Sequence, residues 1–238
     1  MQPDLVEAHH DLGVAYAAVG EWAKAAAYYA QAIESQPLSD AWFQLACARL
    51  LAGDTKGYQE LCKQVLQRAG ATKDPYATYI ASRLCMLRRQ EAIEPAQLVR
   101  WAEQALASDP KAVWLLHALG AAHYRAGELD KALRRCRESL EADPKWGGAV
   151  LNWLVLAMTH QRLGHAEKAR QWLNKAAQWR DKAPRGTDKS VVVSPANLHL
   201  SDWLEFNVLY REAHALLKDR APVKSDNKPK QSRQAVDK

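Results

Sequence analysis

The sequence predicts an all-α fold, an α-α superhelix (solenoid) of about five helix pairs with a C-terminal capping helix. Three observations predict it. Small-residue anchors recur at an interval of about 34 to 37 residues. Apolar residues between the anchors follow a helical period, and Gly or Pro marks the segment ends. Because one helix pair leaves an apolar face open, neighbouring pairs stack to bury it.

The first copy of the pattern shows the anchors most completely, with a first helix expected over residues 5–18. Gly13 has no side chain, so the partner helix can approach closely, and the small Ala25 faces it. Tyr29 then fills the space between the two helices. The anchors of this copy are Leu12, Gly13, Tyr16, Ala25, Tyr29 and Pro37.

Two further good copies and two weaker ones follow along the chain. The good copies are anchored at Gly120, Ala132 and Pro144, and at Ala157 and Ala169. The weaker copies begin at Trp42 and at Tyr76. Ala25 and Ala132 are 107 residues apart, whereas Ala132 and Ala169 are 37 apart, so the longer gap holds three units. We therefore expect five helix pairs.

The periodicity breaks after the fifth pair. A final helix starts near Asp202, where Glu205 three residues later predicts a capping box. We expect this helix to cover the last exposed apolar face of the array. The expected organisation is a repeat array over 1–181, a loop over 182–200 with β-prone valines at 191–193, the capping helix over 201–218, and a basic disordered tail over 219–238.

Composition and charge exclude several classes of protein. With 48% hydrophobic and 25% charged residues the chain should fold, and no apolar stretch approaches the roughly 20 residues of a membrane span. The acidic start lacks the features of a secretory signal, so we expect a cytoplasmic protein. The tail from Arg220 carries six basic and two acidic residues, or +4 of the net charge of +6. The remaining +2 is too little for a nucleic-acid footprint on the folded part.

No metal, cofactor or disulfide is expected. The four cysteines are scattered among apolar residues without metal-ligand spacing. His117 and His123 are six residues apart on one helix, on nearly opposite faces, and no nucleophile elbow, phosphate loop or dinucleotide fingerprint is present. An enzyme would require the fold to bring distant residues such as His117 and Glu128 together. We expect a protein without catalytic activity.

The first helix enters the array without a polar helix before it. The outer face of residues 5–18 should therefore be partly apolar and unpaired. We expect either a homodimer through this uncapped N-terminal helix pair or a further segment upstream.

The Leu-Gly-x-x-Tyr spacing, followed by Ala-x-x-x-Tyr and Pro, resembles the signature of the tetratricopeptide repeat (TPR), with His9 in place of the leading Trp. Over residues 1–218 the chain is also similar to the TPR region that follows the catalytic domain of large bacterial serine/threonine protein kinases. The strings that carry this likeness are Leu51-Ala-Gly-Asp-Thr-Lys-Gly-Tyr58, Leu115-Leu-His-Ala-Leu-Gly120, Tyr124-Arg-Ala-Gly127, Leu151-Asn-Trp-Leu-Val-Leu-Ala-Met158 and Asp202-Trp-Leu-Glu-Phe206.

The kinase likeness implies descent and a link to kinase signalling, or an accessory fragment of such a kinase, but no kinase activity. A kinase needs a Gly-rich loop, a strand Lys, a catalytic loop and an Asp-Phe-Gly motif. Phe43 and Phe206 are the only phenylalanines, and neither is followed by Gly. The repeats imply instead a scaffold that binds proteins or peptides.

The candidate binding site is the concave groove that successive first helices line. Aromatic and Arg side chains supply most interface energy, about 2 kcal/mol or more for a buried anchor. The inward residues expected to bind a partner are His10, Phe43, Arg83, Trp114, His117, Tyr124, Arg125, Met158 and Arg162.

Two other interpretations of these residues stay open. Trp114, Trp153 and Met158 could be ordinary packing between pairs, since apolar residues at helical spacing usually form core. TPR domains that hold a partner's terminal carboxylate use Lys and Asn in the groove, where this chain has His10 and Val14. The basic tail and the arginine runs offer an alternative site for acidic partners or nucleic acid.

Overall fold

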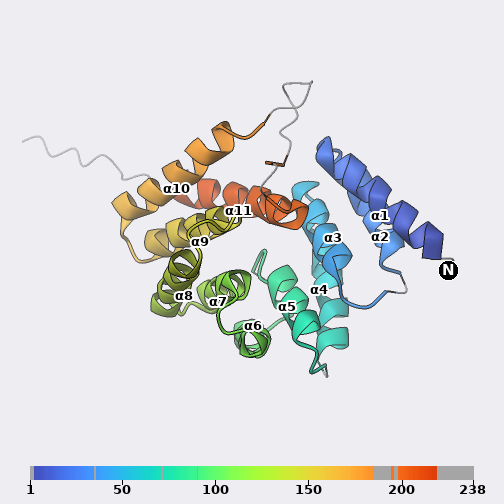
Figure 1. Ribbon diagram of the computed structural model, residues 1–238, viewed down its shortest axis with the longest axis horizontal. Coiled ribbons are helices and arrows are strands. Elements are labelled where there is room, and N and C mark those ends of the chain that lie inside the picture. The colour runs from blue at the N-terminus through green and yellow to red at the C-terminus, as the bar shows by residue number, and fades with distance from the viewer. Residues whose placement is uncertain are drawn as a thin grey trace, which may run out of the picture.

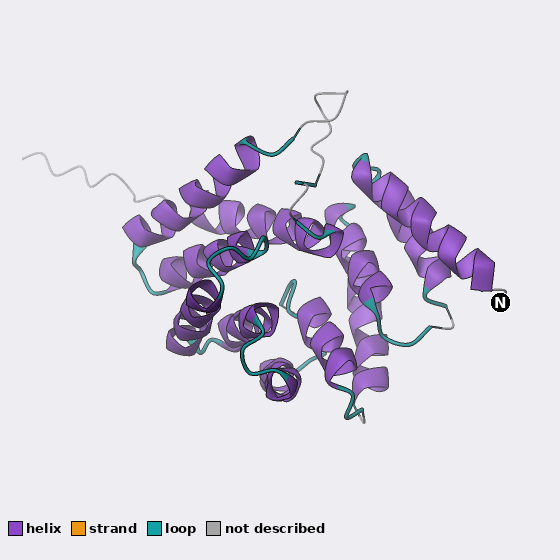
Figure 2. Cartoon of the chain, in the orientation of Figure 1, coloured by secondary structure: helices purple, strands orange, loops and turns teal. Residues whose placement is uncertain are grey.

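The computed structural model describes residues 3–34, 36–70, 72–89, 91–184, 194–195 and 198–218, and this part of the chain forms eleven helices and no strand (Figures 1 and 2). The predicted all-α solenoid is confirmed. The expected valine loop at 191–193 and the tail over 219–238 lie outside the described residues. The helices are α1 (Pro3–Ala18), α2 (Trp22–Ala32), α3 (Asp40–Leu51), α4 (Thr55–Ala69), α5 (Pro75–Cys85), α6 (Pro95–Ser108), α7 (Val113–Ala126), α8 (Leu129–Ala142), α9 (Ala149–Arg162), α10 (Ala166–Asp181) and α11 (Leu200–Lys218).

Helices α1 to α10 form five consecutive pairs. Each odd-numbered helix packs against the even-numbered helix that follows it, and each pair packs against the next. The pairs follow an arc that begins at α1 and α2 and ends at α9 and α10 (Figure 1). An arc of this kind has a concave inner side, toward which α3, α5, α7 and α9 present one face.

Four of the five pairs share the same turn between their two helices. Gly20, Gly53, Gly127 and Gly164 have φ between 74° and 83°, the left-handed region that a residue without Cβ enters at least cost. In the fourth pair the amide of Glu128, which follows Gly127, donates to the carbonyl of His123 at 3.0 Å. The third pair has no such glycine, and a longer connection joins α5 to α6.

The predicted close approach of paired helices is visible at two glycines. A Cβ added to Gly13 would lie 2.6 Å from the ring of Tyr29, and one added to Gly120 would lie 2.7 Å from Cys136 Sγ. Ala25, the small residue of the first pair, is fully buried, as are its counterparts Ala132 and Ala169, and so is Ala157, which takes the place of Gly13 in the fifth pair. Leu12 was expected to be a packing anchor of the first pair, and the structure corrects this. Its side chain points outward from α1, and 42% of it is exposed.

The position of α11 differs from the expectation that the final helix only covers the end of the array. The helix contacts α10, as a cap would, but it also contacts α9 and α3, so it runs back across the inner side of the arc (Figure 1). Its apolar face is too long for the last pair alone: Trp203, Phe206, Val208 and Leu209 are buried with Ala213. The concave side of the solenoid therefore holds a helix of the same chain.

Candidate functional site

The candidate site is the concave groove with α11 lying in it. At the α10 end the contact is aromatic: Trp203 and Phe206 of α11 are stacked with ring centroids 5.5 Å apart, and Trp179 of α10 meets Phe206 at 5.1 Å. These rings close the groove against α10. Aromatic pairs of this kind contribute about 0.5–1.5 kcal/mol beyond the area that they bury.

A cluster of charged side chains lies under the middle of α11. Arg83 of α5 donates from Nε to Glu205 Oε2 at 2.7 Å, and its Nη2 forms an ion pair with Asp202. His117 of α7 lies with Nε2 3.0 Å from the other Glu205 oxygen. Glu205 is 0% exposed and Arg83 is 4% exposed, so the ion pair is held away from water.

The charged cluster continues into a buried polar chain beneath α7. His117 Nδ1 lies 3.1 Å from Asn152 Oδ1 of α9, and Asn152 Nδ2 donates to Ser139 Oγ at 2.9 Å. Ser139 in turn donates to the carbonyl of Val113 at 2.8 Å. The His117 ring therefore joins the Glu205 carboxylate to a chain of hydrogen-bonding groups from α7, α8 and α9.

The Glu205 carboxylate stays ionised despite its burial. Burial alone would raise its pKa, but the positive charge of Arg83 and the hydrogen bond with His117 outweigh that effect and hold the pKa below its ordinary value. Because its pKa is depressed, the Glu205 carboxylate of α11 is an anion at neutral pH where it contacts the groove. The groove floor therefore recognises a negative charge.

A second arginine fixes the other half of α11. Arg125 of α7 reaches Glu212 with both terminal nitrogens, and its Nη2 donates to Glu212 Oε2 at 2.6 Å. The same guanidinium donates to the carbonyls of Met86 and Leu87, the latter at 2.7 Å. A planar guanidinium that pairs with both oxygens of one carboxylate fixes orientation as well as position.

Polar contacts also join α11 to the first half of the array. Gln44 of α3 donates to Ser201 Oγ at 3.3 Å, and the same amide lies 2.9 Å from the ring of His10 on α1. Arg211 of α11 donates to the carbonyl of Leu51 at 2.8 Å. Helix α11 is thus tied to residues of α3, α5, α7 and α9.

The structure brings several of the predicted groove residues together under α11. Arg83, His117 and Arg125 contact its carboxylates, and the Arg83 guanidinium lies 4.1 Å above the ring of the buried Phe43. Tyr124 and Met158 are also buried. These residues are engaged within the chain and do not line an open channel.

Three predicted groove residues lie elsewhere. Arg162 is exposed and donates to the carbonyl of Tyr124 at 2.8 Å, so it joins α9 to α7. Trp114 is 46% exposed at the start of α7, which corrects its interpretation as packing between pairs. His10 is half-buried beside Gln44.

Sequence reasoning missed the acidic partners of the groove. Asp202 and Glu205 were expected to form a capping box, but the helix begins at Leu200 and both carboxylates bind Arg83. A helix N-terminus in solvent can use such a pair for capping, whereas here the nearby arginine offers a stronger partner. The available signal was the seven-residue spacing of Glu205 and Glu212 on an otherwise apolar face.

The described residues do not assemble a metal site, and they do not bring together the pair named above for an enzyme. Among the ranges with described placement, no group of three or more His, Cys, Asp and Glu could hold a metal ion, and all four cysteines are free and buried. Glu128 contacts His123 and Lys131, whereas His117 contacts Glu205, so the pair that an enzyme was expected to need is not together. The described helices include no segment with the length and hydropathy of a membrane span.

Comparison with known proteins identifies the repeats. Models of the tetratricopeptide repeat match residues 6–38, 113–138 and 152–182, and none of the matching models describes an enzyme. The matched segments correspond to the first, fourth and fifth helix pairs. The fold is an all-α solenoid of TPR repeats, a fold associated with scaffolds that bind proteins or peptides.

Several solved structures resemble the chain at low sequence identity, and the first of these shows the same fold. A thermophilic TPR protein of Thermus thermophilus is 19% identical, with a TM-score of 0.52 over 88% of this chain and 99% of its own. MamA of Desulfovibrio magneticus RS-1 is 14% identical, with a TM-score of 0.44 over 77% and 100%. YrrB, a TPR protein with an unusual peptide-binding site, is 17% identical, with a TM-score of 0.41 over 73% and 86%. No curated protein sequence matches the chain.

Proposed function

We propose that this chain is a non-catalytic scaffold whose concave groove binds an amphipathic acidic helix of a partner protein, and that α11 occupies the groove when the partner is absent. The observation that carries the proposal is the seating of α11, whose Glu205 and Glu212 meet Arg83 and Arg125 inside the groove. Helix-in-groove recognition is a common mode of peptide binding. The resident helix therefore indicates the chemistry of the segment that would replace it.

The partner segment must match α11 in two respects. It needs carboxylates about seven residues apart, or two helical turns, to reach both arginines. It also needs an apolar face that carries aromatic rings, because Trp203 and Phe206 fill the end of the groove near α10. A tethered α11 has an effective concentration in the millimolar range, so a partner must bind tightly or be present locally to displace it.

A labelled peptide of residues 198–218 tests this proposal on the full chain. Wild-type protein should bind it weakly, because α11 already fills the groove. Glu212→Lys places a cation against Arg125 and loosens the resident helix, so this variant should bind the wild-type peptide at least about tenfold more tightly. Fluorescence anisotropy measures the difference.

Two controls sharpen the experiment. Glu141→Lys makes the same charge change at an exposed position and should bind the peptide as wild-type does. A peptide with its own Glu212 changed to Lys should not bind the loosened variant. The proposal is wrong if Glu212→Lys does not bind the wild-type peptide while its far-UV circular dichroism shows that it is still folded. In that case the groove does not accept a helix from another molecule.

A second candidate partner is another copy of this chain, which would meet the outer face of α1. Leu5 and Leu12 are 48% and 42% exposed, and their seven-residue spacing places them on one face of α1; Val19, just after the helix, is 53% exposed. An exposed apolar stripe of this length supports a homodimer. Sedimentation equilibrium should show a dimer that Leu12→Glu converts to a monomer, and a wild-type monomer at all concentrations would exclude it.

The compartment and the kinase link are narrower parts of the same proposal. Four buried free thiols suit the reducing cytoplasm, which we propose as the location. The likeness to the TPR region of bacterial serine/threonine kinases supports a partner in kinase signalling, or an origin as the accessory part of such a kinase. Co-purification of a kinase with wild-type protein, but not with an Arg83→Met, Arg125→Met variant, tests the link to the groove.

The basic tail is an alternative site for acidic partners or nucleic acid. Its charge of +4 from Arg220 onward supports this interpretation. Binding of a DNA or RNA duplex near 0.15 M salt, lost on truncation after Leu217, would favour the tail over the groove. No binding at that salt concentration would exclude it.

A further inference from the structure

A cationic hollow lies between the last turn of α10 and the C-terminal half of α11, two helices that pack against each other (Figure 1). Its volume is about 540 Å³, and it is open to solvent. The described residues that line it are Arg180, Tyr210, Arg211, His214, Ala215 and Lys218. None of these residues carries a carboxylate. The arginines and the lysine therefore give the described lining three positive charges and no negative one.

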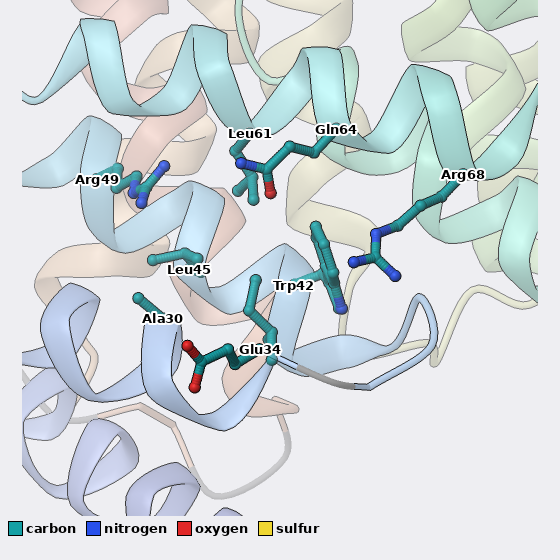
Figure 3. A pocket seen from close by; sticks show the side chains of 9 residues that line it. Ala30, Glu34, Trp42, Leu45, Arg49, Leu61, Gln64 and Arg68 are labelled. Atoms are coloured by element: carbon teal, nitrogen blue, oxygen red, sulfur yellow. The ribbon is translucent and has the colours of Figure 1, made fainter.

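Two other hollows mix arginines with carboxylates. The hollow between α2, α3 and α4 holds Glu34 together with Arg49 and Arg68 (Figure 3). The hollow along α8 is lined by Leu133 and by residues of both charges, which are Asp130, Arg134, Arg137, Glu138 and Glu141. An anionic polymer would be repelled as well as attracted at either of them. The small net charge of the chain outside the tail therefore does not describe the cationic hollow, where the charge is of one sign.

Contacts within the protein hold two of the cations in place. Arg211 Nη1 donates to the carbonyl of Leu51 at 2.8 Å, and the guanidinium carbon of Arg180 lies 4.3 Å from the centroid of the Tyr210 ring. Asp181 lies 3.6 Å from Arg180, but its side chain is 64% exposed, so water screens this pair. A cation that is already ordered loses less conformational entropy when an anion binds to it.

A stack of aromatic rings runs from the core to the cationic hollow. The ring centroids of Phe206 and Tyr210 are 5.5 Å apart, and those of Tyr210 and His214 are 6.0 Å apart. Phe206 is buried and His214 is exposed, so the stack ends at the surface. A planar base can extend such a stack. The described lining has no aliphatic side chain larger than Ala215, so it offers little to a lipid tail or to the apolar face of a partner helix.

We propose that the cationic hollow binds a short stretch of single-stranded nucleic acid. Phosphates of the strand lie against Arg180, Arg211 and Lys218, and a base stacks on His214. These cations are hydrated before binding, so the driving force is the release of counterions from the strand rather than the pairing of unmet hydrogen-bond donors. The bases of a duplex are enclosed between its strands and cannot reach His214, so the site favours a single strand.

Fluorescence anisotropy of the full chain with labelled oligo-dT and oligo-U, each of about ten nucleotides, tests this site. Each phosphate contact contributes about −0.7 to the slope of log affinity against log salt concentration. The variant Arg180→Gln, Lys218→Gln removes two contacts, so its slope should be shallower than that of wild type by about 1.4, and its affinity at low salt about tenfold or more lower. The basic tail is the same in both proteins, so its contribution cancels. The strand that binds more tightly identifies DNA or RNA as the source.

Two matched variants separate the cationic hollow from a general effect of charge. Arg134→Gln, Arg137→Gln makes the same change of net charge at exposed positions of α8 and should leave the slope as it is in wild type. Lys218→Gln alone changes an exposed residue at the end of α11 and leaves the contact of Arg180 with Tyr210 in place. It should give about half of the change in slope, with an unchanged far-UV spectrum.

An abasic strand with the same number of phosphates tests the stacking. It should bind wild type about fivefold or more weakly than oligo-dT does, and His214→Ala should reduce this difference. An unchanged slope in both hollow variants, an equal change in the α8 control, or equal binding of the abasic strand would each overturn the proposal. Binding of phosphatidylserine vesicles without binding of either strand would also overturn it, in favour of a membrane surface. None of these measurements requires displacement of α11, so they leave the groove proposal to its own experiment.

Discussion

Replacing Arg83 with Met should destabilise the protein by about 3–5 kcal/mol, the cost of removing one partner from a buried ion pair. The structure supports the upper part of this range, because Glu205 is 0% exposed and would lose the guanidinium that pairs with it. Met preserves an apolar contact with Phe43, so little of the loss comes from packing. A typical domain is stable by about 5–15 kcal/mol, so the change is measurable.

Urea unfolding followed by tryptophan fluorescence and far-UV circular dichroism measures this loss. Trp203 lies on α11, so fluorescence reports the docking of the helix as well as global unfolding. The double variant Arg83→Met, Glu205→Leu should regain much of the lost stability, since two apolar groups replace both charges. Glu60→Gln breaks an exposed pair with Lys63 and should cost less than about 1 kcal/mol.

The outcome that contradicts this reasoning is specific. A loss below about 1 kcal/mol for Arg83→Met would mean that the ion pair is screened by water. A loss in the double variant equal to the sum of the losses in Arg83→Met and Glu205→Leu would mean that the two side chains do not act as a pair, since their coupling energy would then be zero. Either result would mean that the ion pair of Arg83 with Glu205 does not stabilise the docked position of α11.

Three further predictions follow from burial and close packing. Glu205 has a depressed pKa in the folded state, so its stabilisation is present above the ordinary carboxyl pKa and is lost as the pH falls through the lower folded value. Acid titration of fluorescence should show this loss, and Glu205→Gln should flatten it. Burial and the nearby His165 lower the pKa of His160, so the unfolded chain binds more protons and stability should fall as the pH drops below about 6.5. His160→Gln should reduce that slope in urea titrations between neutral and mildly acid pH, and an unchanged slope would contradict it. Gly120→Ala should cost about 1–3 kcal/mol because its Cβ meets Cys136 Sγ at 2.7 Å. Cys136→Ala in the same chain should recover part of that cost. If the losses in unfolding free energy of the two single variants simply add in the double variant, the contact is contradicted.

The repeat architecture could be predicted because its signals are local. Gly13 and Gly120 have neighbours close enough to exclude a side chain, and each contact joins two helices that are adjacent in sequence. The same holds for the left-handed glycines between paired helices. A recurring interval then fixes how many pairs are present without knowledge of any long-range contact.

The position of α11 could not be predicted in this way. An apolar face indicates that a helix is buried, but not which distant surface covers it. Arg83 and Arg125 were recognised as inward-facing, and Glu205 and Glu212 were visible on the final helix, yet nothing local connects residues about a hundred positions apart.

The crossing of α11 alters how the molecule can fold and melt. A linear repeat protein gains stability from nearest neighbours, so its units can unravel one after another from an end. Here Gln44 meets a residue 157 positions later and Arg83 meets one 122 positions later, so the second to fifth pairs share a single late-synthesised element. We expect these four pairs to lose structure in one cooperative step. During translation, moreover, the array leaves the ribosome with its arginines uncovered until the final helix has been made, an interval of seconds in which chaperones or partners find the groove open.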